Sequence, residues 1–246
     1  MVDFPDHLTA VILAGGLGTR LREVVPDRPK VLADVAEKPF LSYLFDQLLA
    51  EGFRSAVLCT GYRAEMVLAQ YGEAYGDLRL RYSREMTPLG TGGAIRQALP
   101  LVETRYASIL NGDSFFGAGF LPLWKAVSES GAGAGMLLAQ VEDAARYGRV
   151  EISDAGWILG LHEKDGLNTP GLINAGKYIV QREWVEAIPE GRVVSLEREV
   201  FPDWVRRGFL GVESGAPFVD IGTPSSLVEG HQLFRNIESA SRVGDR

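Results

Sequence analysis

The amino-acid sequence predicts an α/β fold, in which a Rossmann-like, doubly wound and mostly parallel sheet is joined to a smaller β-rich part. Three observations lead to this prediction. Apolar runs alternate with amphipathic helical segments through the first half of the 246-residue chain, which is the pattern of βαβ units. After Gly135 the rhythm changes, and strand-like runs follow one another closely. A glycine-rich loop comes directly after the first apolar run, as is typical of ligand-binding α/β sheets.

The first half of the chain alternates between strands and helices. The apolar run Leu8–Leu13 predicts a buried parallel strand. Residues 39–49 predict an amphipathic helix, because Pro39 suits a first helical turn and Gly52 a C-terminal stop. The other elements expected here are strands at Ser55–Thr60, 78–82 and 107–110 and helices at 62–71, 92–99 and 120–130.

The second half predicts mainly strands. Three strands are expected at 136–141, 148–153 and 157–162, with Asp154-Ala155-Gly156 as a hairpin turn. They are followed by a strand at 172–180, short helices at 182–187 and 195–207, a second hairpin formed by 209–212 and 217–220 that turns at Ser214-Gly215-Ala216, and a closing helix at 224–234. We expect the polar tail from Glu238 to be frayed.

Composition and charge exclude several classes of protein. A net charge of -7 and a pI of about 5.1 argue against a nucleic-acid binder that relies on a basic surface. Residues 1–7 lack the regions of a signal peptide, and no apolar run is long enough to span a bilayer, so no membrane partner is expected. The one cysteine, Cys59, excludes an internal disulfide, and its apolar neighbours predict a buried, inert thiol. A reduced cytoplasm is the expected compartment, and association into a homo-oligomer is left open.

The strongest functional signal is the stretch Ala14-Gly15-Gly16-Leu17-Gly18-Thr19-Arg20-Leu21, which Pro29-Lys30 completes downstream. Its glycines let the backbone turn tightly and expose N–H groups to anionic oxygens. Arg20 adds a planar cation and Lys30 a point charge. This combination predicts a polyphosphate site, because an ordinary βα connection would explain the glycines but not both cations.

Two generic nucleotide-binding motifs do not apply. The fingerprint G-x-G-x-x-G that would begin at Gly16 requires a third glycine where Leu21 stands. A Walker-type match at 171–177 has Tyr178 where Ser or Thr must hold magnesium, and no strand-to-helix turn is expected there.

The first loop and its lysine resemble the signature of the sugar-phosphate nucleotidyltransferases, the enzymes that make nucleotide-sugars. The resemblance runs from Ala10 to about Leu233. It implies a nucleotide-diphospho-sugar transferase fold, an NTP and a sugar 1-phosphate as binding partners, and Mg²⁺ as cofactor. In the first loop it assigns nucleotide contacts to Ala14, Gly15, Gly16, Gly18 and Thr19.

A single domain is expected over residues 1–246, because the sequence shows no linker and no internal repeat. The resemblance divides it into a nucleotide-binding part at about 8–135 and a sugar-binding and closing part at about 136–237.

Two carboxylates are candidate metal ligands. Asp113 follows an expected strand end, where open α/β sheets place their ligands, and a carboxylate facing a polyphosphate is suited to Mg²⁺. An Asp at a strand end is more often a cap or turn residue. Asp220 lies among apolar neighbours, where an unpaired charge would be costly. The resemblance assigns both residues to the metal.

A second glycine-rich loop, Pro88-Leu89-Gly90-Thr91-Gly92-Gly93-Ala94, enters an expected helix, for which Thr91 would also serve as cap. The resemblance makes this loop the wall of the nucleobase, with Gly90 and Thr91 at the nucleotide, and it places Glu85 at the base edge. An ionised carboxylate only accepts hydrogen bonds. Glu85 therefore matches the adjacent N1–H and N2–H₂ donors of guanine, which favours GTP, while cytosine stays open.

Several segments match the sugar side of the family. The resemblance gives sugar contacts to Glu163, Asn174, Ala175, Tyr147, Gly148 and Gly112, a phosphate contact to Lys164, and a nucleotide contact to Asn111. Without the resemblance, Glu163 and Lys164 would be interpreted as a solvated surface pair. Residues 195–202 predict a helix start capped by Ser195. The resemblance places this segment near the sugar pocket, although the structural role would account for it without a sugar contact.

The reaction that these motifs favour is nucleotidyl transfer, in which Arg20, Lys30 and Lys164 act on the phosphates. The sugar phosphate is already an anion, so catalysis reduces to alignment and charge neutralisation. Among the subfamilies, the sequence most resembles the D-glycero-α-D-manno-heptose 1-phosphate guanylyltransferases. The alternatives are a mannose-1-phosphate guanylyltransferase, a uridylyl- or cytidylyltransferase of the same fold, and a non-catalytic nucleotide-sugar sensor. Such sensors commonly lose cations or carboxylates that this chain retains.

Overall fold

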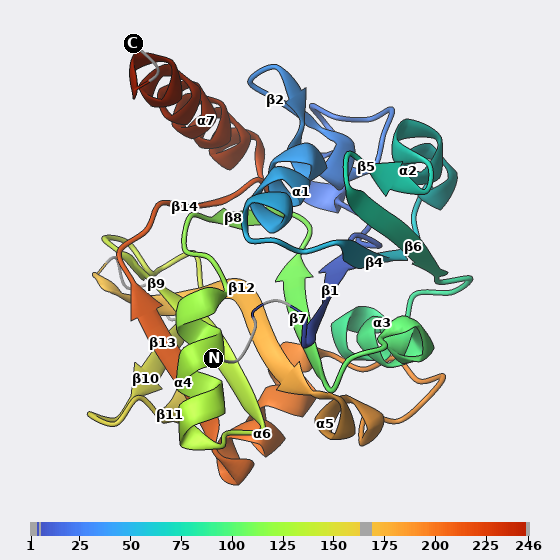
Figure 1. Ribbon diagram of the computed structural model, residues 1–246. Coiled ribbons are helices and arrows are strands. Elements are labelled where there is room, and N and C mark those ends of the chain that lie inside the picture. The colour runs from blue at the N-terminus through green and yellow to red at the C-terminus, as the bar shows by residue number, and fades with distance from the viewer. Residues whose placement is uncertain (1–3, 5, 163–168, 245–246) are drawn as a thin grey trace.

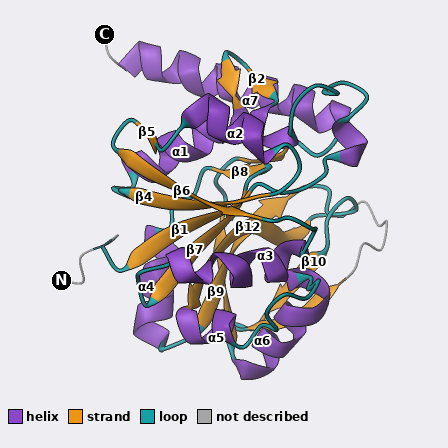
Figure 2. Ribbon diagram, turned by 90° about the vertical axis from the view of Figure 1, so that its right-hand side faces the viewer, coloured by secondary structure: helices purple, strands orange, loops and turns teal. Residues whose placement is uncertain are grey.

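The computed structural model describes residue 4, residues 6–162 and residues 169–244 (Figure 1). One large sheet, with ten strands in the described part, passes through the molecule. Figure 2 shows helices on both of its faces. The predicted α/β class is therefore confirmed.

The half of this sheet that the first part of the chain forms is mainly parallel. Strand β1 (Leu8–Leu13) pairs in parallel with β4 (Ser55–Thr60) and with β7 (Tyr106–Asn111), and β4 pairs in parallel with β6 (Leu78–Arg84). The short strand β5 (Ala74–Tyr75) closes this edge antiparallel to β6. Since carboxyl ends of parallel strands meet at one edge, the loops after these strands converge.

The other half is mainly antiparallel and is built around the long strand β12 (Gly171–Gln181). One side of β12 pairs with β7 and the other with β9 (Ala134–Val141), which continues in parallel to β13 (Phe209–Ser214). Strands β10 (Arg149–Ile152) and β11 (Ile158–His162) form the predicted hairpin beside the beginning of β12.

Helices cover both faces because the central strands are apolar on both sides. In β1, Ala10 and Ile12 face one core and Val11 faces the other. The first core lies under α1 (Phe40–Ala50), α2 (Ala64–Tyr71), α4 (Leu121–Ser130) and α7 (Pro224–Gly244). The second lies under α3 (Gly90–Ala98), α5 (Arg182–Glu186) and α6 (Phe201–Arg207).

Short elements complete the chain. Residues Asp34–Val35 (β2) and Lys38–Pro39 (β3) form a small hairpin, and Ser114–Phe116 (β8) pairs antiparallel with Phe218–Asp220 (β14). Single 3₁₀ turns lie at Thr19–Leu21, Lys30–Leu32 and Leu99–Leu101, and a π-helical turn at Leu196–Val200 precedes α6.

Three expectations for the fold are wrong. Segments 209–212 and 217–220 do not form a hairpin, because β13 pairs with β9 and β14 with β8. The closing helix does not stop at residue 234, and the polar tail is helical as far as Gly244. It is held by Phe234, which stacks on Tyr43, and by Glu238, which accepts a hydrogen bond from the Tyr43 hydroxyl at 3.1 Å.

Two negative expectations agree with the fold. Residues 171–177 lie within strand β12 and form no phosphate loop. Cys59 is a buried free cysteine, and burial raises the pKa of its thiol, which fits an inert group. Within the described ranges, no helix is both long and apolar enough to cross a membrane.

Candidate active site

The loops after β1, β4, β6 and β7 surround a cavity of about 570 Å³. Its described lining brings together most of the residues that the sequence predicts for nucleotide and metal binding: Gly15, Gly16, Lys30, Glu85, Gly90, Thr91, Asn111, Asp113 and Asp220. A volume of this order suits a ligand of nucleotide size.

The first loop shapes one wall of the cavity. The Ala14 N–H still continues the sheet, donating to the Cys59 carbonyl at 2.8 Å, and the chain then leaves it. A Cβ at Gly15 would lie 2.6 Å from Glu85 Oε1 and 3.2 Å from the Gly61 nitrogen, so a side chain there would displace the carboxylate. A Cβ at Gly16 would meet nothing within 4 Å, and this glycine faces open cavity. Gly18 has a φ of +59°, the left-handed conformation that favours glycine.

Thr19 and Arg20 follow in a single 3₁₀ turn at the rim. Neither belongs to the described cavity lining, and Arg20 is exposed. The charge of Arg20 nevertheless opposes the rise in the pKa of Asp220, so Arg20 lies within electrostatic range of that carboxylate. Arg20 is thus available to an anionic ligand at the cavity mouth.

The carboxylates and one lysine form a compact cluster at the cavity floor. Lys30 Nζ donates to Asp113 Oδ2 at 2.7 Å, and the lysine side chain is 11% exposed. The short β8–β14 ladder pairs Ser114 with Asp220, and the Ile221 N–H donates to the Asp113 carbonyl at 2.9 Å. This pairing places the two aspartates side by side.

Burial and the charge of Asp113 raise the pKa of Asp220, while Lys30, the Gly222 N–H and Arg20 act against this rise. The Gly222 N–H donates to Asp220 Oδ1. Among the described residues, the two crowded carboxylates thus share the largely buried cation of Lys30, which leaves this part of the cluster short of positive charge.

The donor set fits a magnesium ion, because Mg²⁺ is commonly held by one or two carboxylates together with substrate phosphates. In the described residues, no group of three or more His, Cys, Asp or Glu side chains could hold a metal ion. Phosphate oxygens of a substrate would have to complete the coordination. Magnesium binding stays a prediction.

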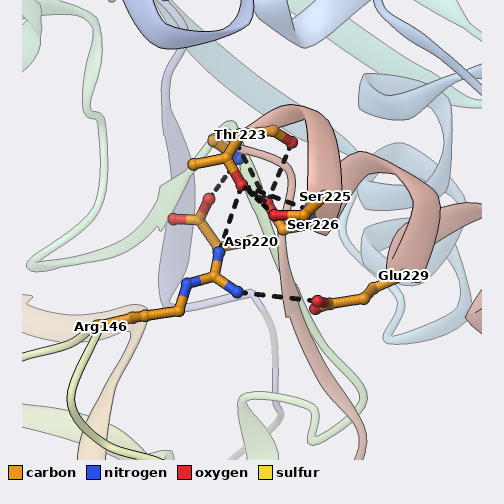
Figure 3. Close-up of polar contacts among 7 residues, drawn as sticks. Arg146, Asp220, Thr223, Ser225, Ser226 and Glu229 are labelled. Carbon is orange, nitrogen blue, oxygen red and sulfur yellow. Dashed lines mark hydrogen bonds and ion pairs between the residues drawn. The ribbon is translucent and has the colours of Figure 1, made fainter.

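Helix α7 begins directly beside this cluster (Figure 3). The Thr223 N–H donates to Ser226 Oγ at 3.1 Å, and the Ser226 N–H donates to Thr223 Oγ1 at 3.3 Å, which is a reciprocal cap. Arg146 reaches across from the loop after β9, donating to Thr223 Oγ1 at 3.3 Å and lying 3.7 Å from Glu229 Oε1. The cap fixes the chain immediately after Asp220.

The second glycine-rich loop packs on another segment of the protein. Cβ atoms at Gly90 and Gly93 would lie 2.5 Å from the carbonyl oxygens of Val194 and Arg192. Gly90 also has a φ of +70°. The Gly92 N–H donates to the Val194 carbonyl at 2.9 Å, so residues 192–194 lie directly against the loop.

Thr91 is not the cap of α3, which has no side-chain cap. Its hydroxyl instead accepts from the Leu196 N–H at 2.8 Å and donates to Glu197 Oε2 at 3.1 Å. Ser195 does cap its turn as expected, because its Oγ accepts from the Arg198 N–H at 3.3 Å.

Glu85 lies between the two glycine-rich loops. Its Oε2 accepts from the Leu89 N–H at 2.8 Å, and its Oε1 is the atom that excludes a side chain at Gly15. Burial raises the pKa of this carboxyl, and the Leu89 N–H opposes the rise. The carboxylate therefore lines the cavity as a partly desolvated acceptor.

The predicted sugar residues that the structure describes are absent from the described lining of this cavity: Gly112, Tyr147, Gly148, Asn174 and Ala175. Asn174 Nδ2 donates to the buried Tyr178 hydroxyl at 2.8 Å, and its Oδ1 accepts from the Gly176 N–H at 2.9 Å. These contacts span an irregularity in β12 that includes the buried Ala175. A Cβ at Gly176 would lie 2.8 Å from Asn111 Nδ2, so β12 approaches the end of β7 closely there.

Tyr147 packs edge to face on Phe218, two residues before Asp220, with ring centroids 5.6 Å apart. A Cβ at Gly148 would lie 2.8 Å from the His162 carbonyl, and one at Gly112 2.6 Å from the Leu13 carbonyl. Both glycines thus have a structural reason for lacking a side chain. Glu163 and Lys164 lie outside the described residues.

Comparison with known proteins decides the family. The nucleotidyl transferase family model matches residues 9–236. The chain belongs to the nucleotidyl transferase family.

Individual relatives in this family cover nearly the whole chain. The D-glycero-alpha-D-manno-heptose 1-phosphate guanylyltransferase of Aneurinibacillus thermoaerophilus is 35% identical over 88% of this chain and 94% of its own length. The mannose-1-phosphate guanylyltransferase of Mycobacterium tuberculosis is 33% identical over 94% of this chain and 66% of its own. The crystal structure of HddC from Yersinia pseudotuberculosis complexed with GMP-PN is 30% identical, covers 92% of this chain and 99% of its own, and superposes with a TM-score of 0.82.

The cavity lining also contains residues to which the sequence analysis assigned no ligand contact. Leu17, Tyr62, Met86 and Glu197 line the described cavity, and Met86 is 85% exposed. The segment that contains Glu197 was expected as a helix start near the sugar pocket, with no role assigned to Glu197 itself. Its carboxylate accepts from both Thr91 and Ser195 at the cavity wall. No local pattern predicted the contact with Thr91, because the two residues lie far apart in sequence.

Proposed function

We propose that this enzyme transfers a guanylyl group from GTP to a sugar 1-phosphate, with D-glycero-α-D-manno-heptose 1-phosphate as the favoured acceptor, giving a GDP-sugar and pyrophosphate. The observation that carries the proposal is the position of Glu85 in the cavity beside the first glycine-rich loop. The names of the heptose and mannose relatives support the same reaction.

In the proposed reaction, an oxygen of the sugar 1-phosphate attacks the α-phosphorus of the nucleotide. The bond from that phosphorus to the bridging oxygen breaks, and pyrophosphate leaves with the electron pair. No histidine lines the described part of the cavity, which suits a nucleophile that needs no base. The task left to the protein is alignment and charge neutralisation.

The cations divide this task. Exposed Arg20 at the rim would hold the leaving phosphates, and Lys30 on the cavity floor the reacting ones. Lys164, carried over from the family, would hold the sugar phosphate. Asp113 and Asp220 would hold magnesium, which when bound neutralises charge on the phosphate oxygens.

The wall residues divide the substrates. Gly15 and Gly16 leave space for the phosphates, and Glu85 would accept from guanine N1–H and N2–H₂. Asn174, Tyr147 and Glu163 would contact the sugar, and Glu197 is a further acceptor at the same wall.

The mannose-1-phosphate enzyme is the second candidate function, since the chain aligns with such a relative over 94% of its residues. The position of Glu85 favours guanine as the nucleobase for both candidates. Only the acceptor sugar separates them, and the described sugar-side contacts favour neither.

The first test is substrate choice by the wild-type protein and by Glu85→Gln. We expect kcat/KM to be highest with GTP among GTP, UTP, CTP and dTTP. Glu85→Gln should lower the GTP value about tenfold to a hundredfold and narrow the gap to UTP, because an amide offers both a donor and an acceptor. A wild-type preference for UTP or dTTP would refute the guanylyl assignment. Heptose and mannose 1-phosphates as alternative acceptors separate the two candidates.

The second test is removal of the metal. EDTA, Asp113→Asn and Asp220→Asn should each lower turnover by more than about a hundredfold, because charge neutralisation is worth several kcal/mol. Circular dichroism should show an intact fold in both variants. Full activity in EDTA, with no increase when magnesium is added, would remove the metal from the proposal.

A further inference from the structure

Lys177 is a buried lysine that the proposed reaction does not use. It lies on β12, and only 2% of its surface is exposed. Burial lowers its pKa to about 8, although the carboxylate of Glu51 acts in the opposite direction. Burying an ammonium group is costly, and an apolar side chain at such a position is often equally stable or more so.

The lysine holds the main chain of the segment that follows β8, here named the 116–120 loop. Lys177 Nζ donates to the Ala118 carbonyl at 2.8 Å and to Gln47 Oε1 at 2.7 Å. Gln47 Nε2 in turn donates to the Phe116 carbonyl at 2.9 Å. The carbonyls of Phe116 and Ala118 are thereby bound to side chains of α1 and β12.

Glu51, the residue that follows α1, makes a further contact with the 116–120 loop. Its Oε2 accepts from the Phe120 N–H at 2.6 Å, whereas its buried Oε1 has no hydrogen-bond partner among the described residues. A Cβ at Gly119 would lie 2.9 Å from Glu51 Cδ, so glycine lets the loop lie directly on the carboxyl. A buried ammonium group beside a carboxylate whose buried oxygen is incompletely satisfied is a poor device for stability alone.

The 116–120 loop is continuous with the carboxylate cluster. Strand β8 connects it to Asp113, and β8 pairs with β14, which ends in Asp220. The Gly117 N–H also donates to the Pro217 carbonyl at 2.8 Å, just before β14. A shift of the loop would therefore move both aspartates.

We propose that Lys177 is a positioning residue, which fixes the 116–120 loop to β12 and so holds the two carboxylates in register with Asn174. Lys177 stands three positions after Asn174 on the same strand, so one element carries both the sugar-side amide and the anchor of the carboxylates. The effect on catalysis rests on the proposed function. The structural connection from Lys177 through the 116–120 loop to the two carboxylates does not.

The main test is the double variant Lys177→Met/Glu51→Gln. Removing the lysine alone would leave a buried carboxylate uncompensated. The Gln keeps the acceptor for the Phe120 N–H, and the Met fills the lysine's volume but donates nothing to the Ala118 carbonyl. We expect a near-wild-type melting temperature, an unchanged KM for GTP, and a kcat reduced about tenfold to a hundredfold by misplacement.

A second readout needs no catalysis. The Ile221 N–H donates to the Asp113 carbonyl, so its hydrogen exchange reports on the carboxylate register. In the double variant this amide should exchange about tenfold faster. Gln47→Glu should also speed the exchange of this amide, because a carboxylate keeps the acceptor for Lys177 and repels the Phe116 carbonyl. This variant replaces the double variant in both measurements if the double variant does not fold.

Ser42→Ala is the matched control. It removes another buried hydrogen bond of α1, between Ser42 Oγ and the Tyr71 hydroxyl at 2.9 Å, without touching the loop. Both readouts should stay at wild-type values. Wild-type kcat and wild-type Ile221 exchange in the folded double variant would overturn the proposal. If the wild-type protein transferred no nucleotidyl group, the exchange result would still decide on the positioning role.

Discussion

The two glycine-rich loops of the cavity look alike in sequence, yet the fold uses them differently. Gly16 in the first loop has open space where a Cβ would be. Gly93 in the second loop has the Arg192 carbonyl oxygen at 2.5 Å from that position. The first loop leaves room for a ligand, and the second leaves room for another segment of the protein.

This difference shows that a glycine-rich motif can have two unrelated physical causes in one site. In the first loop, substitutions at Gly16 and at Arg20 should change activity and leave stability alone, because no neighbour lies within 4 Å of the Gly16 Cβ position and Arg20 is exposed. Substitutions in the second should first change stability, because residues 192–197 depend on its shape. Three variants test this division.

The largest effect is expected for Arg20→Ala in the first loop. Arg20 is exposed, and its charge opposes the rise in the pKa of Asp220 in the carboxylate cluster. Loss of a charge-assisted donor to the transferring phosphates should cost about 2.7–4 kcal/mol in kcat, or about 10²–10³-fold. The free energy of unfolding should change by less than about 0.5 kcal/mol, as for other surface substitutions. Steady-state kinetics and urea titration measure the two quantities.

Arg22→Ala is a suitable control, since Arg22 is also exposed in this region but lies over the Tyr62 ring at 4.7 Å. It should retain most of the turnover. Near-wild-type turnover in Arg20→Ala, or an equal loss in both variants, would end the assignment of Arg20 to the phosphates.

An intermediate effect is expected for Gly93→Ala. Helix propensity alone would favour alanine within α3, but its Cβ would lie 2.5 Å from the Arg192 carbonyl oxygen and 2.9 Å from Leu89 Cβ. Such overpacking typically costs about 1–3 kcal/mol. Urea denaturation should therefore show a lower free energy of unfolding, with turnover of the remaining folded protein less affected.

Gly16→Ala is the reciprocal variant for this experiment. With no neighbour within 4 Å, its stability should be unchanged, while its methyl group should raise the KM for GTP. If Gly16→Ala unfolded the protein and Gly93→Ala did not, the division between the loops would be reversed.

Local patterns predicted much of the fold and of the site. The apolar run of β1, the glycine loop after it and the turn at Gly156 all depend on neighbours in sequence. Asp113 was predictable because strand ends in α/β sheets carry ligands. The cavity then brings these residues together, as the family resemblance implied.

The failures have a common physical cause, which is long-range pairing. Ser214-Gly215-Ala216 has turn-like composition, but the partners of its flanking strands are β9 and β8. Thr91 has the composition of a helix cap, but its hydroxyl binds Leu196 and Glu197. The polar end of α7 is helical where a frayed tail was expected, since Glu238 accepts from Tyr43. Such partners are invisible to a short window of sequence.

The smallest effect is expected for Glu85, which lies between the two loops. It is a pH dependence of the free energy of unfolding. Burial places the pKa of Glu85 above its ordinary value of 4.5 in the folded protein. The folded state thus binds more protons than the unfolded state between 4.5 and the raised value. The stability contributed by this group is therefore fully present below 4.5 and is lost as the pH rises through the folded pKa.

Glu85→Gln carries no titrating group, so its stability minus that of wild type should increase through this window and then level off. The increase should stay below about 1 kcal/mol, because Glu85 is only partly buried and solvent screens its charge. Buried Asp220 and Glu51 also have raised pKa values, but both are present in the two proteins and cancel in the difference. Urea titrations at several pH values between about 4 and 7 measure it. A flat difference would mean that Glu85 is fully solvated and that the wall between the loops is open to water. A difference that decreases with pH would mean that hydrogen bonds to the carboxylate outweigh its burial.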